Sequence, residues 1–390
     1  MTTEPMRSAT LFLLGAVVAG TLAIGPNAVA QGAPTVTLGA NRTVIVFGRS
    51  VTLFGRIRPR AAGETVNIVK EGGRRVASAT TDERGRYRVS IEPHRNMVLR
   101  AQWVAAVSDP VRLKVRPILH VSLGPVRLFG RTRVRGTLRP IHKGDRVNVA
   151  LRRNGKVIRR RAVRLSGLSF STRFHIRHPG SYAAVVRFND ADHAGAGATS
   201  ASRATPLPAL SRGSRSAYVT LLERRLRSLG YYLPRADRTY DSKTYDAVIA
   251  FNKVQRRLRS GNVVESTWKA LADPRRPRAR SRAGGFHIEI DQTKQVVYTV
   301  WRGRVANVLH TSTGAGGATR DGSYRVFRKV NGYSGGGLYY PSYFDGLRAI
   351  HGWREVPTYP ASHGCARVPM WAAQWIYGKA KLGTRVLVYH

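Results

Sequence analysis

Cysteine is almost missing from this chain, because Cys365 is the only one in 390 residues. A single cysteine excludes any disulfide within the chain, so burial and hydrogen bonds must hold the fold. Acidic residues are also scarce: 21 Asp and Glu stand against 66 Lys and Arg, giving a formal net charge of +45. An excess of this size favours anionic partners. Beyond the N-terminal region, no apolar run is long enough to cross a bilayer.

The N-terminal residues 1–30 have the pattern of a secretory signal. Arg7 precedes an apolar run from Ala9 to Ile24, and the small residues Ala28 and Ala30 follow it. We therefore expect an exported protein of the cell wall or extracytoplasmic space, with cleavage after Ala30. The run is also long enough to remain as a membrane anchor if cleavage does not occur. Export, and the lack of a basic-aromatic motif, argue against nucleic acid as a partner.

Residues 34–116 and 117–206 are two copies of one pattern. The sequence Val-Phe-Gly-Arg at 46–49 returns as Leu-Phe-Gly-Arg at 128–131. Short runs of alternating apolar and polar residues are separated by turn signals such as Asn-Gly at 154–155. The pattern predicts two β-sandwich modules, which resemble bacterial Ig-like domains. Neither contains a catalytic cluster, so we interpret both as spacers.

Residues 216–272 change from strand to helix periodicity. Apolar spacing predicts one helix ending at Gly230, a second at 243–259 and a short third at 265–271. These helices, with Leu-Gly-Tyr at 229–231 and Thr-Trp at 267–268, resemble the type 1 peptidoglycan-binding domain. The resemblance implies binding to the wall glycan. The family's loop with two glycines is here Asp-Arg-Thr-Tyr-Asp at 237–241, and a spacer that no longer binds is the alternative.

Residues 273–285 form a linker rich in Pro and Arg, which we expect to be extended. Its arginines are candidates for contact with anionic wall polymers, or are simply solvated. From 286 to 390 alternation returns, with strands predicted at 287–291, 295–300, 304–309 and 384–389 and a helix at 369–379. The predicted fold class is thus multidomain and mainly β: two Ig-like β-sandwich modules, a three-helix bundle and a β-rich C-terminal domain.

The candidate site is built around Cys365. A thiol needs a base to become a nucleophilic thiolate, and histidine is the usual base. His363 is too near in sequence for a well-oriented hydrogen bond, whereas His351 comes from another segment and is the better base. Gly364 lets a substrate approach the backbone, so the N–H groups of Gly364 and Cys365 are expected to form an oxyanion hole. Metal binding by His351, His363 and Cys365 is the alternative, although zinc sites usually have more ligands.

Motifs from 286 to 390 occur in a characteristic combination. They are Ser-His-Gly-Cys-x-Arg at 362–367, Ile-His-Gly at 350–352 and Thr-x-x-Gly at 319–322. Together they resemble the L,D-transpeptidase catalytic domain of the YkuD type, over the whole of 286–390. The residues to which we assign roles on this basis are Cys365 (nucleophile), His351 (general base), Gly352 (backbone carbonyl orienting His351), Gly364 (oxyanion N–H), and Ser362, His363, Arg367, Tyr339 and Tyr340 (substrate contacts).

The resemblance implies an acyltransferase that needs no cofactor and acts on peptidoglycan stem peptides. Cys365 is expected to attack the last bond of a tetrapeptide stem, release D-Ala and form a thioester. The amine of a neighbouring stem then gives a 3→3 cross-link. Water as acceptor, making an L,D-carboxypeptidase or endopeptidase, is one alternative, and a non-catalytic wall-binding protein is another. For Tyr339 and Tyr340, packing against the sheet edge is the alternative to a substrate contact.

Overall fold

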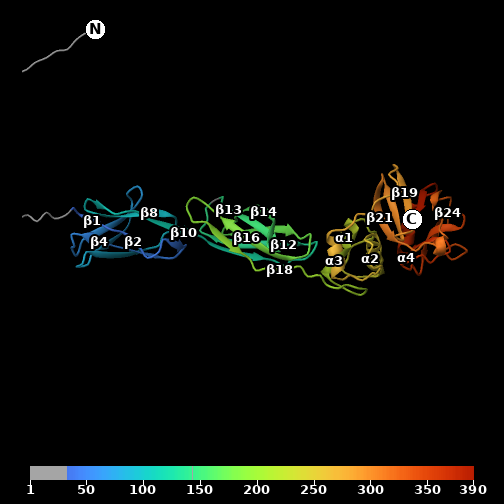
Figure 1. The fold of residues 1–390 in the computed structure, drawn as a ribbon, viewed down its shortest axis with the longest axis horizontal. Coiled ribbons are helices and arrows are strands. Elements are labelled where there is room, and N and C mark those ends of the chain that lie inside the picture. The colour runs from blue at the N-terminus through green and yellow to red at the C-terminus, as the bar shows by residue number, and fades with distance from the viewer. Residues whose placement is uncertain (1–32, 143) are drawn as a thin grey trace, which may run out of the picture. The chain divides into compact units, whose positions relative to one another are not determined.

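The structure is a computed structural model that describes residues 33–142 and 144–390. The predicted signal at 1–30 lies outside the described residues. Within the described part, no helix is both long and apolar enough to span a membrane. The described residues divide into two compact units (Figure 1): 33–43, Ser50–Pro93 and Met97–Leu113 form the first, and Val44–Arg49, His94–Asn96, 114–142 and 144–390 form the second.

The first unit is a β-sandwich of the Ig-like type. One sheet has the order β1-β4-β2, with β7 also paired to β4, and the other contains β10-β8-β5-β6, with β9 on β8. The strand bounds are β1 Thr35–Val36, β2 Gly39–Ala40, β4 Val51–Arg58, β5 Thr65–Lys70, β6 Arg75–Thr80, β7 Arg86–Ile91, β8 Met97–Trp103, β9 Ala106–Val107 and β10 Val111–Arg116. Alternate residues such as Leu53, Ile57 and Ile68 are fully buried, as the period-two pattern predicts. The last residues of β10 belong to the second unit and pair there in parallel with β3 (Val44–Val46).

The second unit begins with another Ig-like sandwich, which we call the second β module. Its sheets have the orders β11-β12-β15 and β14-β13-β16-β17, with β18 on β16. The bounds are β11 Ile118–Leu123, β12 Arg131–Arg139, β13 Arg146–Arg153, β14 Lys156–Arg164, β15 Ser169–His175, β16 Ser181–Phe188, β17 Ala196–Thr199 and β18 Arg203–Ala204. Val134, Val149 and Phe170 belong to one buried cluster between the two sheets.

The helical domain contains α1 (Ala217–Ser228), α2 (Ser242–Val254) and α3 (Glu265–Ala272). Ser216 and Asp241 cap α1 and α2 by accepting N–H groups of their first turns. Gly230 follows α1 with φ 91°, so the predicted end of this helix is confirmed. The second helix is shorter than predicted, because Arg256 takes a left-handed φ of 55° and the chain turns away.

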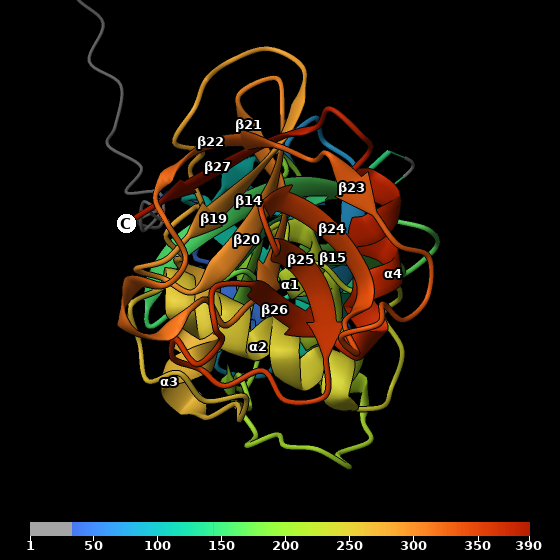
Figure 2. The same cartoon turned by 90° about the vertical axis from the view of Figure 1, so that its right-hand side faces the viewer.

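The C-terminal domain has two sheets and one helix, and these elements lie nearest the viewer in Figure 2. The first sheet has the order β21-β20-β19-β27-β22 and the second β23-β24-β25-β26, with α4 packed on β24 and β25. The bounds are β19 Phe286–Asp291, β20 Val296–Trp301, β21 Arg304–His310, β22 Gly322–Arg325, β23 Arg328–Lys329, β24 Tyr339–Asp345, β25 Arg348–Trp353, β26 Ala366–Pro369, α4 Met370–Lys379 and β27 Arg385–Tyr389. The four strands and the helix predicted here are present, although Pro369 caps α4 and does not lie inside it.

The helical domain covers one face of the first sheet. Val296, Tyr298 and Val300 of β20 share a buried cluster with the helices, whereas Val297 belongs to the cluster on the opposite face. The segment after α1 also extends this sheet, because Tyr232 N–H donates to the Val308 carbonyl at 3.0 Å. The two predicted domains therefore share one hydrophobic core.

Lys253 is buried at this contact, with only 2% of its surface exposed. Its Nζ lies 2.9 Å from the Gln295 carbonyl, 2.9 Å from the Thr311 carbonyl and 2.7 Å from His310 Nδ1. Burial, with Arg259 nearby, holds the pKa of Lys253 well below its ordinary value. Three acceptors satisfy the three donors of the ammonium group, so the helical domain is attached by polar as well as apolar contacts.

Lys253→Met should lower the free energy of unfolding by about 2–4 kcal/mol, because buried acceptors lose their donor. Urea denaturation followed by tryptophan fluorescence measures the change. The control Lys269→Met removes an exposed lysine paired only with Glu265 and should change the value by less than about 0.5 kcal/mol. Equal effects of the two variants would contradict a structural role for the Lys253 contacts.

Candidate active site

Parallel pairing of β25 with β26 brings the two candidate catalytic side chains together. His351 is in register with Arg367, and Cys365 immediately precedes β26. Residues in register across a parallel pair point to the same face of the sheet. The thiol sulfur accepts the Ala349 N–H at 3.4 Å and lies 3.8 Å from the Leu347 carbonyl oxygen. His351 and Cys365 therefore border the same cavity.

The His351 ring is held in one tautomer. Its Nδ1 lies 2.9 Å from the carbonyl oxygen of Gly352, and a carbonyl can only accept, so Nδ1 carries the hydrogen. The other nitrogen, Nε2, then carries the lone pair, for which the described part of the chain offers no donor. Burial lowers the pKa of His351 to about 4, with the positive charge of Arg367 acting in the same direction. The ring is thus a neutral base at neutral pH.

Cys365 is also neutral at rest. Burial raises the pKa of its thiol, and the Ala349 N–H and the arginines Arg367 and Arg348 oppose that shift only in part. Within the described residues, no hydrogen bond joins the thiol to a histidine. The pair is therefore a thiol and an imidazole, without the separated charges of a thiolate–imidazolium pair.

The loop at 362–365 is fixed by two hydroxyl groups. Ser362 Oγ accepts the Gly364 N–H at 3.1 Å and donates to the Cys365 carbonyl at 2.6 Å. Thr319 Oγ1 donates to the Gly364 carbonyl at 2.8 Å. A trans peptide points its C=O and N–H in opposite directions, so Thr319 fixes the direction of the Cys365 N–H. Among the described residues, that N–H has no acceptor.

These contacts change the expected assignments for Gly364 and Ser362. The Gly364 N–H is already used inside the loop, whereas the Cys365 N–H has no acceptor among the described residues. Ser362 borders the cavity, but its hydroxyl is committed to the loop backbone. Gly364 has φ 130°, and a Cβ there would lie 2.9 Å from the Ala318 carbonyl oxygen, so glycine is required.

The cavity has a volume of about 690 Å³, and none of its described lining residues is acidic. Arg328 stacks on Tyr343, with its guanidinium carbon 3.8 Å from the ring centre, and Arg367 lies 5.2 Å from the ring centre of Trp353. The lining residues are Arg328, Val330, Tyr333, Ser334, Gly335, Gly336, Leu338, Tyr343, Leu347, His351, Trp353, Ser362, His363, Cys365 and Arg367. The residues at its wall suit an anionic peptide.

Tyr339 and Tyr340 are placed differently from the expected substrate contacts. Neither lines the cavity; both pack against the hydrophobic core under α4, and Tyr340 meets the Tyr377 ring edge-on at 5.1 Å. They pack against the core, and β24, which carries them, is an inner strand of its sheet. Tyr333 and Tyr343 supply the aromatic wall in their place. Pattern alone could not separate them, because an irregular register in β24 breaks the strand alternation.

Sequence reasoning gave no role to Thr319, Arg328, Arg348 or Trp353. The motif Thr-x-x-Gly contains Thr319, but its spacing does not reveal a contact with the Gly364 carbonyl. Arg348 Nε donates to the Ala318 carbonyl at 2.7 Å and so ties the Thr319 segment to β25. For Trp353, the only sign in the sequence of a place at the site was that it follows His351 by two residues. The centres of their rings lie 5.6 Å apart, and the rings meet edge-on.

The comparisons with known proteins agree with this geometry. Residues 285–388 match the family model described as L,D-transpeptidase catalytic domain. The chain carries an L,D-transpeptidase catalytic domain. Residues 215–271 match the putative peptidoglycan binding domain. The protein is thus an L,D-transpeptidase-type cell-wall enzyme with a peptidoglycan-binding domain, and peptidoglycan is its partner.

Solved L,D-transpeptidases are similar to parts of the chain. A crystal structure from Xylanimonas cellulosilytica is 37% identical, with 47% of this chain and 99% of that chain covered and a TM-score of 0.45. The catalytic domain from Enterococcus faecium is 22% identical, with 28% and 100% covered and a TM-score of 0.25. L,D-transpeptidase 3 from Mycobacterium tuberculosis is 16% identical, with 27% and 61% covered and a TM-score of 0.25. No match was found among the curated proteins.

Alkylation of Cys365 in this catalytic domain should accelerate continuously as the pH rises through about 9, because burial raises the pKa of the thiol. Iodoacetamide labelling measured by mass spectrometry gives the profile. His351→Gln should leave the profile nearly unchanged between about pH 6 and 8, since a neutral imidazole supplies no charge to pair with a thiolate. A plateau below pH 7 that disappears in this variant would indicate an ion pair instead.

Proposed function

We propose that the protein is exported and forms 3→3 peptidoglycan cross-links, with Cys365 as nucleophile. The observation that carries this proposal is the fixed His351 tautomer, whose Nε2 is left free while the ring borders the same cavity as the thiol. Export rests on the signal pattern at 1–30. A wall enzyme must act outside the cytoplasm, because its polymer is there.

The first half of the proposed reaction transfers an acyl group to sulfur. Cys365 Sγ attacks the carbonyl carbon of the L-centre to D-Ala bond while its proton passes to His351 Nε2. The oxyanion accepts the Cys365 N–H, whose direction is set by the bond from Thr319 to the Gly364 carbonyl. The carbon–nitrogen bond then breaks, D-Ala takes the proton from His351, and a thioester remains.

The second half returns the acyl group to an amine. The amine of a neighbouring stem attacks the thioester carbonyl and gives a proton to His351. The carbon–sulfur bond breaks, and the thiol of Cys365 takes that proton. Arg328, Arg367 and His363 are the cavity's candidates for binding the carboxylates of the donor stem.

Cys365→Ala should abolish conversion of a disaccharide-tetrapeptide to its cross-linked dimer, because no other cysteine is present. Mass analysis of the products measures dimer and tripeptide separately. Dimer supports the amine acceptor, whereas tripeptide alone indicates water as acceptor and an L,D-carboxypeptidase. Retention of either product by Cys365→Ala would rule out this nucleophile.

His390→Ala is a matched control for handling and stability. This terminal side chain is exposed and pairs with Asp321 outside the cavity, so product formation should stay within about twofold of the unchanged chain. A non-catalytic wall-binding role would instead give neither dimer nor tripeptide from any form of the chain, together with binding to isolated sacculi.

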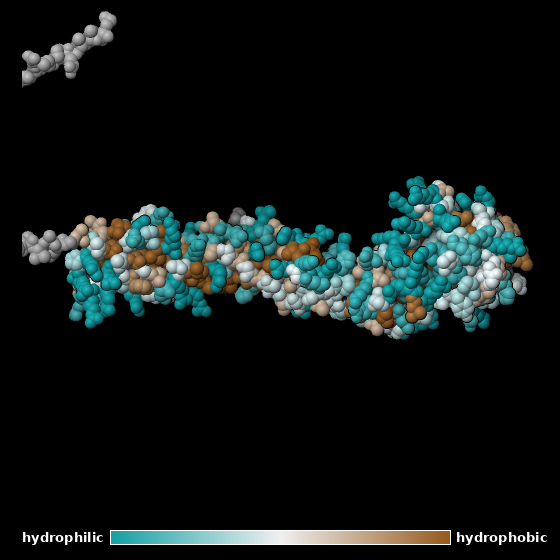
Figure 3. Space-filling view, viewed as in Figure 1, coloured by the Kyte–Doolittle hydropathy of each residue, from teal (hydrophilic) through white to brown (hydrophobic). Residues whose placement is uncertain are grey.

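We also propose that the second β module binds an anionic wall polymer. Its outer sheet face presents arginines in neighbouring strands, around the small side chain of Ala150. Arg160 of β14 is the cross-strand neighbour of Ala150 in β13, and Arg187 of β16 is the cross-strand neighbour of Asn148 in β13. A hollow of about 410 Å³ lies here, and Arg152, which lines it, has a buried Nε with no acceptor among the described residues. Figure 3 shows hydrophilic (teal) and hydrophobic (brown) residues side by side on the face of the molecule drawn there.

Replacing Arg160 and Arg187 together by Ala should weaken binding to a soluble phosphodiester polymer such as teichoic acid. It should also reduce the slope of log affinity against log salt by about one unit for each lost contact. Titration at several salt concentrations gives both values. The control pair Arg135→Ala and Arg173→Ala removes the same charge from the other sheet. Equal losses in both double variants would show a general charge effect and no site.

A further inference from the structure

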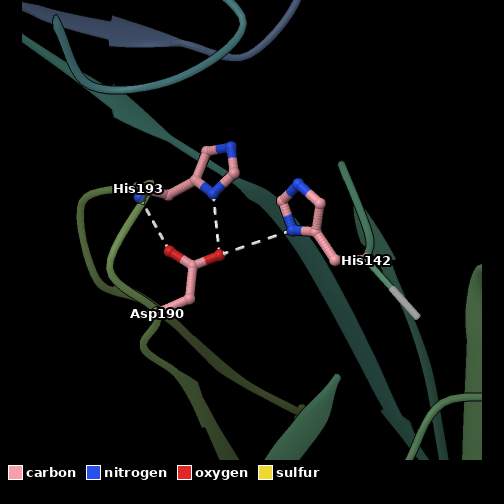
Figure 4. A group of neighbouring side chains, drawn as sticks. All are labelled: His142, Asp190 and His193. Carbon is pink, nitrogen blue, oxygen red and sulfur yellow. Dashed lines mark hydrogen bonds and ion pairs between the residues drawn. The ribbon is translucent and has the colours of Figure 1, made fainter. Parts of the chain in front are cut away.

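A histidine–carboxylate cluster lies in the second β module and shares no residue with the catalytic cavity. His142 is in the loop between β12 and β13, and Asp190 and His193 are in the loop between β16 and β17. One ligand atom of each side chain lies within 4.8 Å of the others. Figure 4 shows both imidazole rings turned toward the same carboxylate.

His193 is the buried member of the cluster, with 1% of its side chain exposed. Its Nε2 lies 3.0 Å from the carbonyl oxygen of His94, which is in the same compact unit. Because a carbonyl only accepts, Nε2 carries a hydrogen. In a neutral ring, the lone pair of Nδ1 would then face Asp190 Oδ2 at 2.8 Å. Two lone pairs at that distance repel, so a cation, either a proton or a metal, must lie between them.

The remaining geometry favours a metal ligand set. His142 Nδ1 lies 3.9 Å from the same Asp190 oxygen. Tetrahedral zinc lies about 2.0–2.1 Å from each ligand atom, so its ligand atoms are about 3.3 Å apart. This separation lies between the distances of Asp190 Oδ2 to His193 Nδ1, 2.8 Å, and to His142 Nδ1, 3.9 Å. Asp190 is itself oriented, because its Oδ1 accepts the His193 main-chain N–H at 2.7 Å. The side chain of His142 is 52% exposed, which leaves a path for entry and a place for a water ligand.

We propose that His142, Asp190 and His193 form a binding site for a zinc-class divalent cation. Two imidazole nitrogens and one carboxylate suit zinc, whereas magnesium and calcium prefer oxygen ligands throughout. The His94 carbonyl orients the His193 ring from behind, as such partners do in metal sites. Binding replaces the proton between His193 Nδ1 and Asp190 Oδ2, and that proton goes to solvent.

The site ties together loops that are far apart in the sequence. The backbone of His142 is fixed within its own loop, because its main-chain N–H donates to Asp145 Oδ2 at 2.7 Å. The cation would then join this loop to the loop that carries Asp190. In a chain with one cysteine, no disulfide can make such a link. The role is stabilisation of the second β module, separate from the reaction at Cys365.

Calorimetric titration of the untagged, full-length chain with zinc chloride tests the site, in a Cys365→Ser background that removes the competing thiol. After treatment with a chelator and dialysis, we expect one zinc per chain, release of about one proton measured in buffers of different ionisation heat, and a higher melting temperature. Magnesium chloride should give neither heat nor a shift. The absence of zinc binding would leave a proton-bridged pair and overturn the proposal.

The His142→Ala variant assigns the binding to this cluster. The side chain is exposed, so the fold should persist while zinc affinity falls by at least about tenfold. His120→Ala removes an exposed histidine of β11 in the same module and should leave the affinity unchanged. Equal affinities of His142→Ala and the parent would place the zinc elsewhere and contradict the proposal.

Discussion

Burial of both faces of the sheet that contains β20 is the constraint on which the catalytic part of the molecule depends. Val296 and Val300 pack against the helical domain, and Val297 packs toward the second sheet. A strand buried on both sides needs apolar cover on both sides. The helical domain is therefore part of the enzyme's core as well as a peptidoglycan-binding domain. This shared core fixes the helices relative to the first sheet, whose other face packs in one core with Ile350 of the sheet that carries His351.

The few acidic residues do structural work inside this basic chain. Glu289 is fully buried, and its carboxylate accepts the N–H groups of Arg280 and Ser281, so the basic linker is attached there to β19. Asp246 accepts the Trp371 indole N–H at 2.7 Å, and burial raises the pKa of its carboxyl to about 6. Because some of the scarce carboxylates are buried, few remain to pair with surface arginines, as Asp82 does with Arg86. The outer face of the second β module is one result.

The active site avoids buried charge until the reaction needs it. A neutral thiol and a neutral imidazole cost less to desolvate than a thiolate and an imidazolium. The proposed proton transfer creates both charges only when substrate fills the cavity. In the proposed reaction the Cys365 N–H binds the oxyanion, and the direction of this N–H is already fixed by Thr319 through the Gly364 carbonyl. Such preorganisation needs no reorientation of the loop during the reaction.

Periodicity was enough to predict the three helices of the helical domain and, in the C-terminal domain, four strands and the helix, and the resemblance of the motifs to a known family implied the contact of His351 with the Gly352 carbonyl. These features depend on near neighbours in the chain, where side-chain period and backbone conformation are directly linked. The partner of the Gly364 N–H, the packing of Tyr339 against the core and the buried contacts of Lys253 were decided only by the tertiary structure. Each joins groups through strand register or through the packing of distant segments. One sequence cannot show which distant segments meet, because many pairings satisfy the same apolar pattern.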